Sequence, residues 1–132
     1  METKYIEAVG RRKTATARVR IVKAKTDRFI VNDKPLAEYF KAGTLQKNIL
    51  TVLKTENAGI ETYEISAKVQ GGGLSSQSDA IKLGVARALV KEKEDRRVPL
   101  KREGYLKRDP RAVERKKFGL KKARKRPQWS KR

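Results

Sequence analysis

The last 26 residues of the chain hold too few apolar side chains to fold by themselves. Residues 107–132 contain 13 basic, two acidic and only six apolar side chains. Burial of so little apolar surface cannot offset the conformational entropy that an ordered chain loses. We therefore predict a folded body over residues 1–106 and a basic extension over residues 107–132, which stays disordered until an anionic partner orders it.

The composition excludes most catalytic chemistry. The chain of 132 residues has no His and no Cys, so it offers no imidazole base, no thiol nucleophile, no zinc ligand of either kind and no disulfide. The fifteen carboxylates form no pair or cluster typical of acid/base catalysis or of a magnesium site, which leaves a carboxylate-dependent nuclease as a weak alternative. We expect no enzyme, no cofactor and no metal site.

The sequence also lacks the features of a membrane or secreted protein. No run approaches the roughly 20 consecutive apolar residues that a membrane span needs, and the first ten residues have no signal-peptide core. We expect an intracellular protein with no membrane partner.

The net charge of +20 indicates a polyanionic partner, with nucleic acid as the first candidate. The body carries 22 basic and 13 acidic residues, a net +9, and the extension carries the remaining +11. Self-repulsion of this size opposes folding, so the charge needs a functional explanation.

Hydrophobic periodicity predicts a body that mixes α-helices and β-strands. We predict strands at residues 5–9, 16–25, 28–31 and 62–70. We predict helices that begin near residues 36, 44 and 75, a short helix over residues 111–118, and an irregular arm over residues 98–106 because Pro99 limits a helix there.

The same periodicity predicts which side chains face the core. In the second and last strands, Val19 and Ile65 are expected inward, whereas Arg18, Arg20 and Lys68 are expected outward. In the third long helix the small residues Ala80, Gly84 and Ala88 predict close approach to the sheet. Five residues at its start, Ser75 to Asp79, supply N-cap candidates, with Asp79 as a helix-terminus acid.

Two short segments are candidates for binding phosphate. Residues 10–14 are predicted as a loop tip that presents Arg11, Arg12 and Lys13, or else as an ordinary solvated turn. The glycines Gly71, Gly72 and Gly73 lie between a strand and a helix, where free amides attract phosphate. They lack the Gly-Lys-Ser/Thr ending of a nucleotide-binding loop, so an RNA phosphate or a plain turn remain the alternatives.

The extension is the strongest binding signal, because its cations are dense enough to follow a phosphate backbone. These cations are Arg108, Arg111, Arg115, Lys116, Lys117, Lys121, Lys122, Arg124, Lys125 and Arg126. Trp129 could stack on a base or anchor the chain by packing. The apolar stripe of the extension is too narrow for insertion into a membrane surface.

Four segments, residues 10–19, 71–81, 84–89 and 108–132, resemble the bacterial-type small-subunit ribosomal protein S9 family. The last is highly specific, down to its Ser-Lys-Arg ending. The small departures are Trp129, where Phe or Tyr is usual, and Ser78, where Ala is common.

The resemblance implies an α+β fold of the ribosomal S5 domain 2-like type, with a mixed sheet packed against helices, a left-handed β-α-β crossover and a long basic C-terminal extension. It implies a structural protein of the small-subunit head, in the cytoplasm or an organelle, with rRNA and neighbouring head proteins as partners. Arg11, Arg12, Lys13, the three-glycine turn and the extension cations would face rRNA. Ser130, Lys131 and Arg132 would contact the anticodon stem-loop of P-site tRNA.

A free basic architectural protein that binds nucleic acid outside the ribosome remains an alternative. A DNA-binding role would need a groove-reading helix or a dimer element, and the sequence shows neither. We therefore do not expect DNA as a partner.

Overall fold

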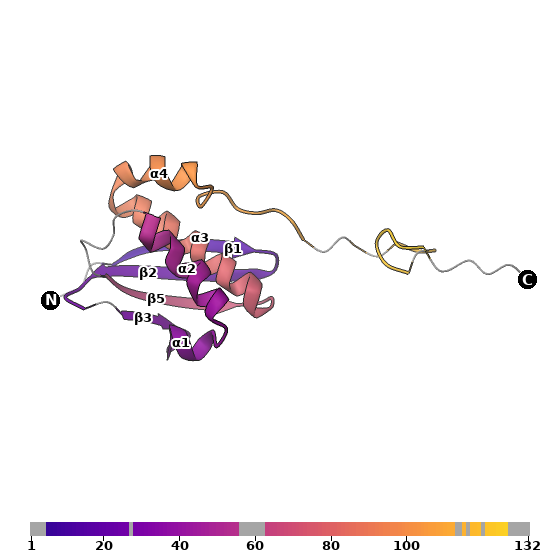
Figure 1. The fold of residues 1–132 in the computed structure, drawn as a ribbon, viewed down its shortest axis with the longest axis horizontal. Coiled ribbons are helices and arrows are strands. Elements are labelled where there is room, and N and C mark those ends of the chain that lie inside the picture. The colour runs from indigo at the N-terminus through magenta and orange to yellow at the C-terminus, as the bar shows by residue number, and fades with distance from the viewer. Residues whose placement is uncertain are drawn as a thin grey trace, which may run out of the picture.

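A five-stranded mixed sheet with helices over one face forms the body of the protein (Figure 1). The computed structural model describes residues 5–26, 28–55, 63–112, 115, 117–119 and 121–126. The strands are β1 (Ile6–Arg12), β2 (Ala15–Lys23), β3 (Arg28–Val31), β4 (Lys34–Pro35) and β5 (Tyr63–Gln70). The helices are α1 (Leu36–Tyr39), α2 (Gly43–Thr55), α3 (Leu74–Glu92) and α4 (Arg97–Arg102), with a 3-10 turn at Glu94–Arg96. This confirms the α+β class and the mixed sheet.

The strand order is β1-β2-β5-β3-β4. β2 pairs antiparallel with both β1 and β5, whereas β3 runs parallel to β5 and antiparallel to β4. The parallel pair requires a crossover, which runs from β3 through β4, α1 and α2 to β5. β2 is therefore flanked by β1, with which it forms a hairpin, and by β5.

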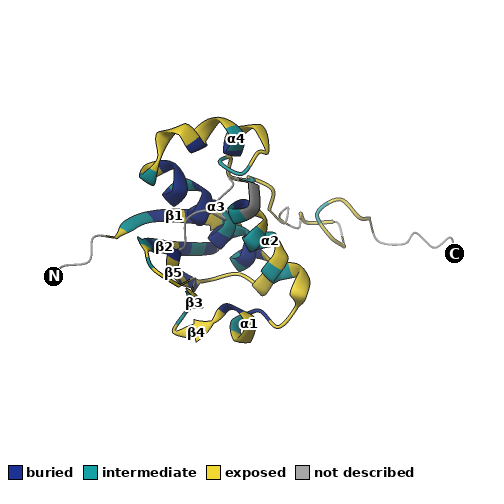
Figure 2. Ribbon diagram, turned by 60° about the vertical axis from the view of Figure 1, so that its left-hand side comes forward, coloured by how far each residue is buried: buried dark blue, intermediate teal, exposed yellow. Residues whose placement is uncertain are grey.

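The core lies between the sheet and α3, which packs along β1 and β2 and beside α2. Val19 and Ile65 are buried on the sheet side, as the alternation predicts, and Ile81, Val85 and Leu89 are buried on α3. Burial of each such side chain contributes about 1.5–3 kcal/mol to folding. Figure 2 shows that burial is concentrated in these central strands and in α3.

Gly84 lets α3 lie directly on the sheet. A Cβ on Gly84 would come within 2.6 Å of Val19 Cγ2, and a Cβ on Gly10 would collide with the carbonyl oxygen of Ala80. Ala80 and Ala88 are also fully buried. The predicted close approach of helix and sheet is confirmed, with Gly10 as its partner on β1.

The structure corrects the prediction that residues 10–14 form a loop. Gly10, Arg11 and Arg12 belong to β1, and the turn consists of Lys13 and Thr14 alone, because Arg12 pairs with Ala15. The strand continues through Gly10 because this residue is held against α3. Lys13 has a positive φ of 53°, as a tight two-residue turn requires.

Three predictions about helices are also wrong. Residues 97–102 form α4 rather than an irregular arm, since Pro99 is its third residue and no hydrogen bond of the helix is lost there. The N-cap of α3 is Gly73, so the serines and Asp79 lie inside the helix. The helix predicted at 111–118 is not formed at residues 111, 112, 115, 117 and 118, and its other positions lie outside the described residues.

Across the described ranges, no helix has both the length and the apolar character needed to cross a membrane.

Candidate nucleic-acid interface

The turn between β1 and β2 presents two cations to solvent. Arg11 and Lys13 are exposed. The two residues lie at the turn end of the hairpin, on either side of Arg12. Arg12 projects toward the opposite face, where its side chain is only 13% exposed.

The three-glycine turn lies against this hairpin turn. Gly71 and Gly72 have φ values of 81° and 65°, which favour glycine. A Cβ on Gly71 would collide with the carbonyl oxygen of Thr14, and a Cβ on Gly72 would lie 3.3 Å from that of Ala15. The structure therefore brings together the two segments predicted to bind phosphate.

The three-glycine turn leads into the N-terminus of α3. The first hydrogen bond of the helix is donated by the amide of Gln77 to the carbonyl of Gly73, at 2.9 Å. The amides of residues 74–76 precede it, and no side chain caps the helix end. The first turn contains no acidic residue. Such an end attracts anions through its free amides and its dipole.

A chain of hydrogen bonds fixes the position of the three-glycine turn. Gln77 donates to the carbonyl of Gly71 at 3.1 Å and accepts from the Tyr39 hydroxyl at 2.6 Å. Asn32 donates to Tyr39 at 3.3 Å and pairs with both main-chain groups of Val69 at 2.9 Å. The turn is therefore held by α1, α3 and the end of β3 before any ligand arrives.

The first residues of the basic extension bind the same end of the body. Arg12 Nη1 donates to the carbonyl oxygens of Arg111 at 2.7 Å and Asp109 at 3.3 Å. Arg12 also forms ion pairs with the Asp109 carboxylate at 3.1 Å and with Asp79 at 3.5 Å. Arg108 donates to the carbonyl of Lys13 at 3.4 Å. Arg12, predicted to face RNA, is thus occupied within the protein.

Asp109 is held in its charged form by its neighbours. The Arg111 side chain donates to Oδ1 of the carboxylate at 3.0 Å and to Oδ2 at 2.7 Å, and the Arg111 amide donates to Oδ1 at 2.9 Å. These hydrogen bonds, aided by the charges of Arg111 and Arg12, keep the pKa of Asp109 well below its usual range. The same pair raises the pKa of Arg111.

The chain runs away from the body beyond the hairpin (Figure 1), and the predicted cations of the extension that the structure describes are exposed. They are Arg108, Arg111, Arg115, Lys117, Lys121, Lys122, Arg124, Lys125 and Arg126. Lys116, Trp129, Ser130, Lys131 and Arg132 lie outside the described residues. The structure therefore brings together the hairpin turn, the three-glycine turn and the start of the extension. We call these three segments together the basic end.

The outer face of the sheet carries cations that the predicted site did not include. Arg18 and Arg20 of β2 and Lys68 of β5 are exposed or half-exposed there, as their outward alternation predicts. Sequence alone does not show that β2 and β5 are neighbours, so it does not show that these cations form one surface.

Within the described residues, no group of three or more Asp or Glu side chains is placed to hold a metal ion. The chemistry of the basic end is that of main-chain amides and cations, which suits anion binding.

Comparison with known proteins gives one consistent result. The family model described as "Ribosomal protein S9/S16" matches residues 10–132. A relative named "Small ribosomal subunit protein uS9" in a Synechococcus species is 56% identical over 126 residues, which cover 93% of this chain and 89% of the relative. Proteins of the same name in Trichormus variabilis and Gloeothece citriformis are each 55% identical, over 93% of this chain and 88% and 89% of their own. These cyanobacterial matches confirm the resemblance and its bacterial type, and they agree with a non-enzymatic protein.

Proposed function

Since this chain belongs to the ribosomal protein S9/S16 family, we propose that it is a structural protein of the small ribosomal subunit that binds small-subunit rRNA. The observation that carries the proposal is the convergence of the hairpin turn, the three-glycine turn and the start of the extension at one end of the body. Three segments distant in sequence thereby offer cations and free amides to one stretch of RNA.

The mechanism is electrostatic. Arg11, Lys13 and the amides at the start of α3 bind phosphates of a folded rRNA surface, while the extension cations follow the backbone away from the body. In this proposal the extension becomes ordered on RNA. Sequence-specific reading of bases is not required, because the rRNA fold itself sets the positions of the phosphates.

Residues 120–132 are long enough to contact a partner at some distance from the body. Residues 120–132 span at most about 45 Å when fully extended, at roughly 3.3 to 3.6 Å per residue. In the family resemblance Ser130, Lys131 and Arg132 contact the anticodon stem-loop of P-site tRNA. We include this contact in the proposal, together with rRNA of the subunit head and neighbouring head proteins as partners in the bacterial cytoplasm.

The proposal extends to one detail of the fold. The parallel pair β3 and β5, joined through α1 and α2, supports the ribosomal S5 domain 2-like type, whose crossover is left-handed. Parallel crossovers are right-handed in about 98% of cases, so the hand is distinctive. An experimental structure of the subunit would settle it.

Sedimentation tests the ribosomal role against a free nucleic-acid-binding protein. Epitope-tagged protein in lysate should travel with small subunits through a gradient of moderate salt and be released only by high salt. Recovery with DNA or at the top of the gradient would contradict the proposal.

Truncation tests the tRNA contact separately. Removal of residues 130–132 should leave subunit assembly nearly intact and weaken P-site tRNA binding. The double variant Lys101→Gln, Arg102→Gln removes the same charge from α4, outside the extension, and provides the control. Unchanged tRNA affinity in the first variant would remove this part of the proposal and leave the rRNA role standing.

A further inference from the structure

The outer face of the sheet, opposite α2 and α3, is covered by no other element in the part of the chain that the structure describes (Figure 2). The strand register arranges its side chains in rows across β1, β2 and β5. The row next to the hairpin turn is Arg11, Thr16 and Gln70, and the next row is Val9, Arg18 and Lys68. These two rows contain cations and hydrogen-bond donors and no acid.

The acids of this face lie further from the hairpin turn. Glu7 is opposite Arg20, and Glu64 is opposite Arg28. Glu7 forms ion pairs with Arg20 at 3.1 Å and with Arg18 at 3.2 Å, and Glu64 lies 3.9 Å from Arg28. The positive charge is therefore concentrated at the end of the face that adjoins the basic end.

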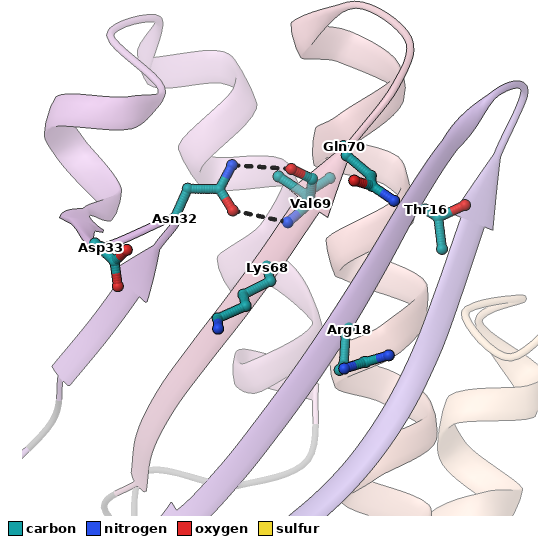
Figure 3. Close-up of a pocket in the computed structure, with 7 residues that line it drawn as sticks. All are labelled: Thr16, Arg18, Asn32, Asp33, Lys68, Val69 and Gln70. Carbon is teal, nitrogen blue, oxygen red and sulfur yellow. Dashed lines mark hydrogen bonds between the residues drawn. The ribbon is translucent and has the colours of Figure 1, made fainter.

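Arg18 and Lys68 are direct cross-strand partners of like charge. Such a pair is destabilising in an antiparallel sheet. Their side chains diverge, Lys68 toward β3 and Arg18 toward β1 (Figure 3). Among the described residues Lys68 has no ion-pair or hydrogen-bond partner, and Arg18 shares Glu7 with Arg20. The repulsion would be relieved by an anion between them.

A shallow cavity of about 550 Å³ occupies this place. It is lined by Thr16, Arg18, Asn32, Asp33, Lys68, Val69 and Gln70 (Figure 3). Asp33 is the one acid in this lining and lies at its β3 side. The hydroxyl of Thr16 and the amide of Gln70 add donors that suit phosphate oxygens.

We propose that this surface, centred on Arg18 and Lys68, is a second RNA-binding site that holds the phosphate backbone across the sheet. The inference rests on the proposed function for the class of ligand. RNA is favoured over a protein partner because the two rows offer cations and polar donors, with Val9 as their one large apolar side chain, whereas protein interfaces use aromatic and aliphatic anchors. The surface also continues directly from the basic end.

Binding measurements on the full chain test the site. The probe is the transcribed head domain of small-subunit rRNA, and the variants are Arg18→Gln, Lys68→Gln and the double variant. Each loss of a phosphate contact should lower the slope of log affinity against log salt by roughly 0.7 to 0.9, and weaken binding roughly fivefold at 0.1 M salt. Lys47→Gln, an exposed cation of α2 on the helical side, is the matched control and should change neither quantity.

Thermal unfolding separates loss of binding from loss of folding. Because Lys68→Gln removes a like-charge pair, the midpoint of unfolding without RNA should stay equal or rise. Equal affinity of the wild type and the double variant, or an equal effect of Lys47→Gln, would overturn the second site and leave the proposed function intact. Failure of the wild type to bind the rRNA would overturn both.

Crosslinking identifies what covers the face in the ribosome. A photoreactive amino acid in place of Ser66, which is exposed beside Lys68 on the same face, is introduced into reconstituted small subunits. Crosslinks to rRNA nucleotides are expected. Crosslinks to a ribosomal protein alone, or to nothing, would overturn the inference.

Discussion

The Arg12 guanidinium donates a hydrogen bond to the main-chain carbonyl of Arg111, with 2.7 Å between Nη1 and the oxygen. The two residues are 99 positions apart in the chain, so this contact joins the first hairpin to the extension. The Arg12 guanidinium also forms ion pairs with the carboxylates of Asp79, on α3, and Asp109. The direction in which the extension leaves the body is thereby set within the protein.

Arg12→Gln should release the start of the extension, whereas Arg11→Gln should not. Hydrogen bonds of a charged group contribute about 1.5–3 kcal/mol, so cleavage by trypsin within residues 107–112 should become roughly tenfold faster in the first variant. Arg11→Gln is the matched control for charge, and should instead lower the salt slope of RNA binding. Equal cleavage rates in the two variants would show that Arg12 does not hold the extension.

The contact between Asp109 and Arg111 should resist acid. A folded pKa below the ordinary Asp value of about 3.9 means that this pair contributes its full stability above that pH, and loses it as the pH falls toward the folded pKa. The carboxyl carbon signal of Asp109, followed by NMR, should therefore show a charged side chain at pH 3. In Arg111→Gln the pKa of Asp109 should rise toward the ordinary value, although the amide of residue 111 and the charge of Arg12 still lower it, and equal titration in both proteins would refute the assignment.

Gly71→Ala should destabilise the protein much more than Gly73→Ala, which should cost only the lower preference of alanine at a helix N-cap. Gly71 has a positive φ, which costs roughly 1–2 kcal/mol for a residue with a Cβ, and the added carbon would also collide with Thr14. Gly73 has a φ of −92° and open space around its Cα. Urea unfolding of both variants measures the difference, and similar losses would contradict the packing of the two turns.

Arg96→Met should cost about 1.5–3 kcal/mol of unfolding free energy, because it removes the charged hydrogen bonds to Tyr63 and Glu92 and leaves the Glu92 carboxylate with Lys23, at 3.3 Å, as an ion-pair partner. Arg96 is 8% exposed and donates to the Tyr63 hydroxyl at 2.6 Å and to Glu92 at 3.0 Å. Arg97→Met, at an exposed neighbour, should change stability by less than about 0.5 kcal/mol. A small loss for Arg96→Met would mean that this pair is compensated elsewhere.

The elements with clear local signals could be predicted from the sequence. Residues 63–70 alternate buried and exposed without exception, and the small residues of α3 indicate close packing that Gly84 confirms. Residues 10–12 could not be placed in β1, because their cations and glycine are typical of a turn, and the packing of Gly10 on α3 involves a partner seventy residues away. Pro99 likewise indicates a break unless it is known to lie in the first turn of α4.

The sequence predicts which types of residue form the candidate site, but it does not predict how these residues are arranged in space. Sequence points to Lys13 and the three glycines as phosphate binders, and the structure places their turns side by side. It cannot separate Arg11, which is exposed, from Arg12, whose partners come from α3 and the extension. It cannot pair Arg18 with Lys68 either, because that requires the strand order.

Crosslinking from the two turns tests the central claim most directly. Photoreactive amino acids replace Thr14 in the hairpin turn and Leu74 at the start of α3, both exposed, in reconstituted small subunits. The account predicts that both positions crosslink to rRNA and to overlapping sets of nucleotides. Crosslinks to distant nucleotides, to ribosomal proteins alone or to nothing would contradict the claim that these turns form one RNA-binding end.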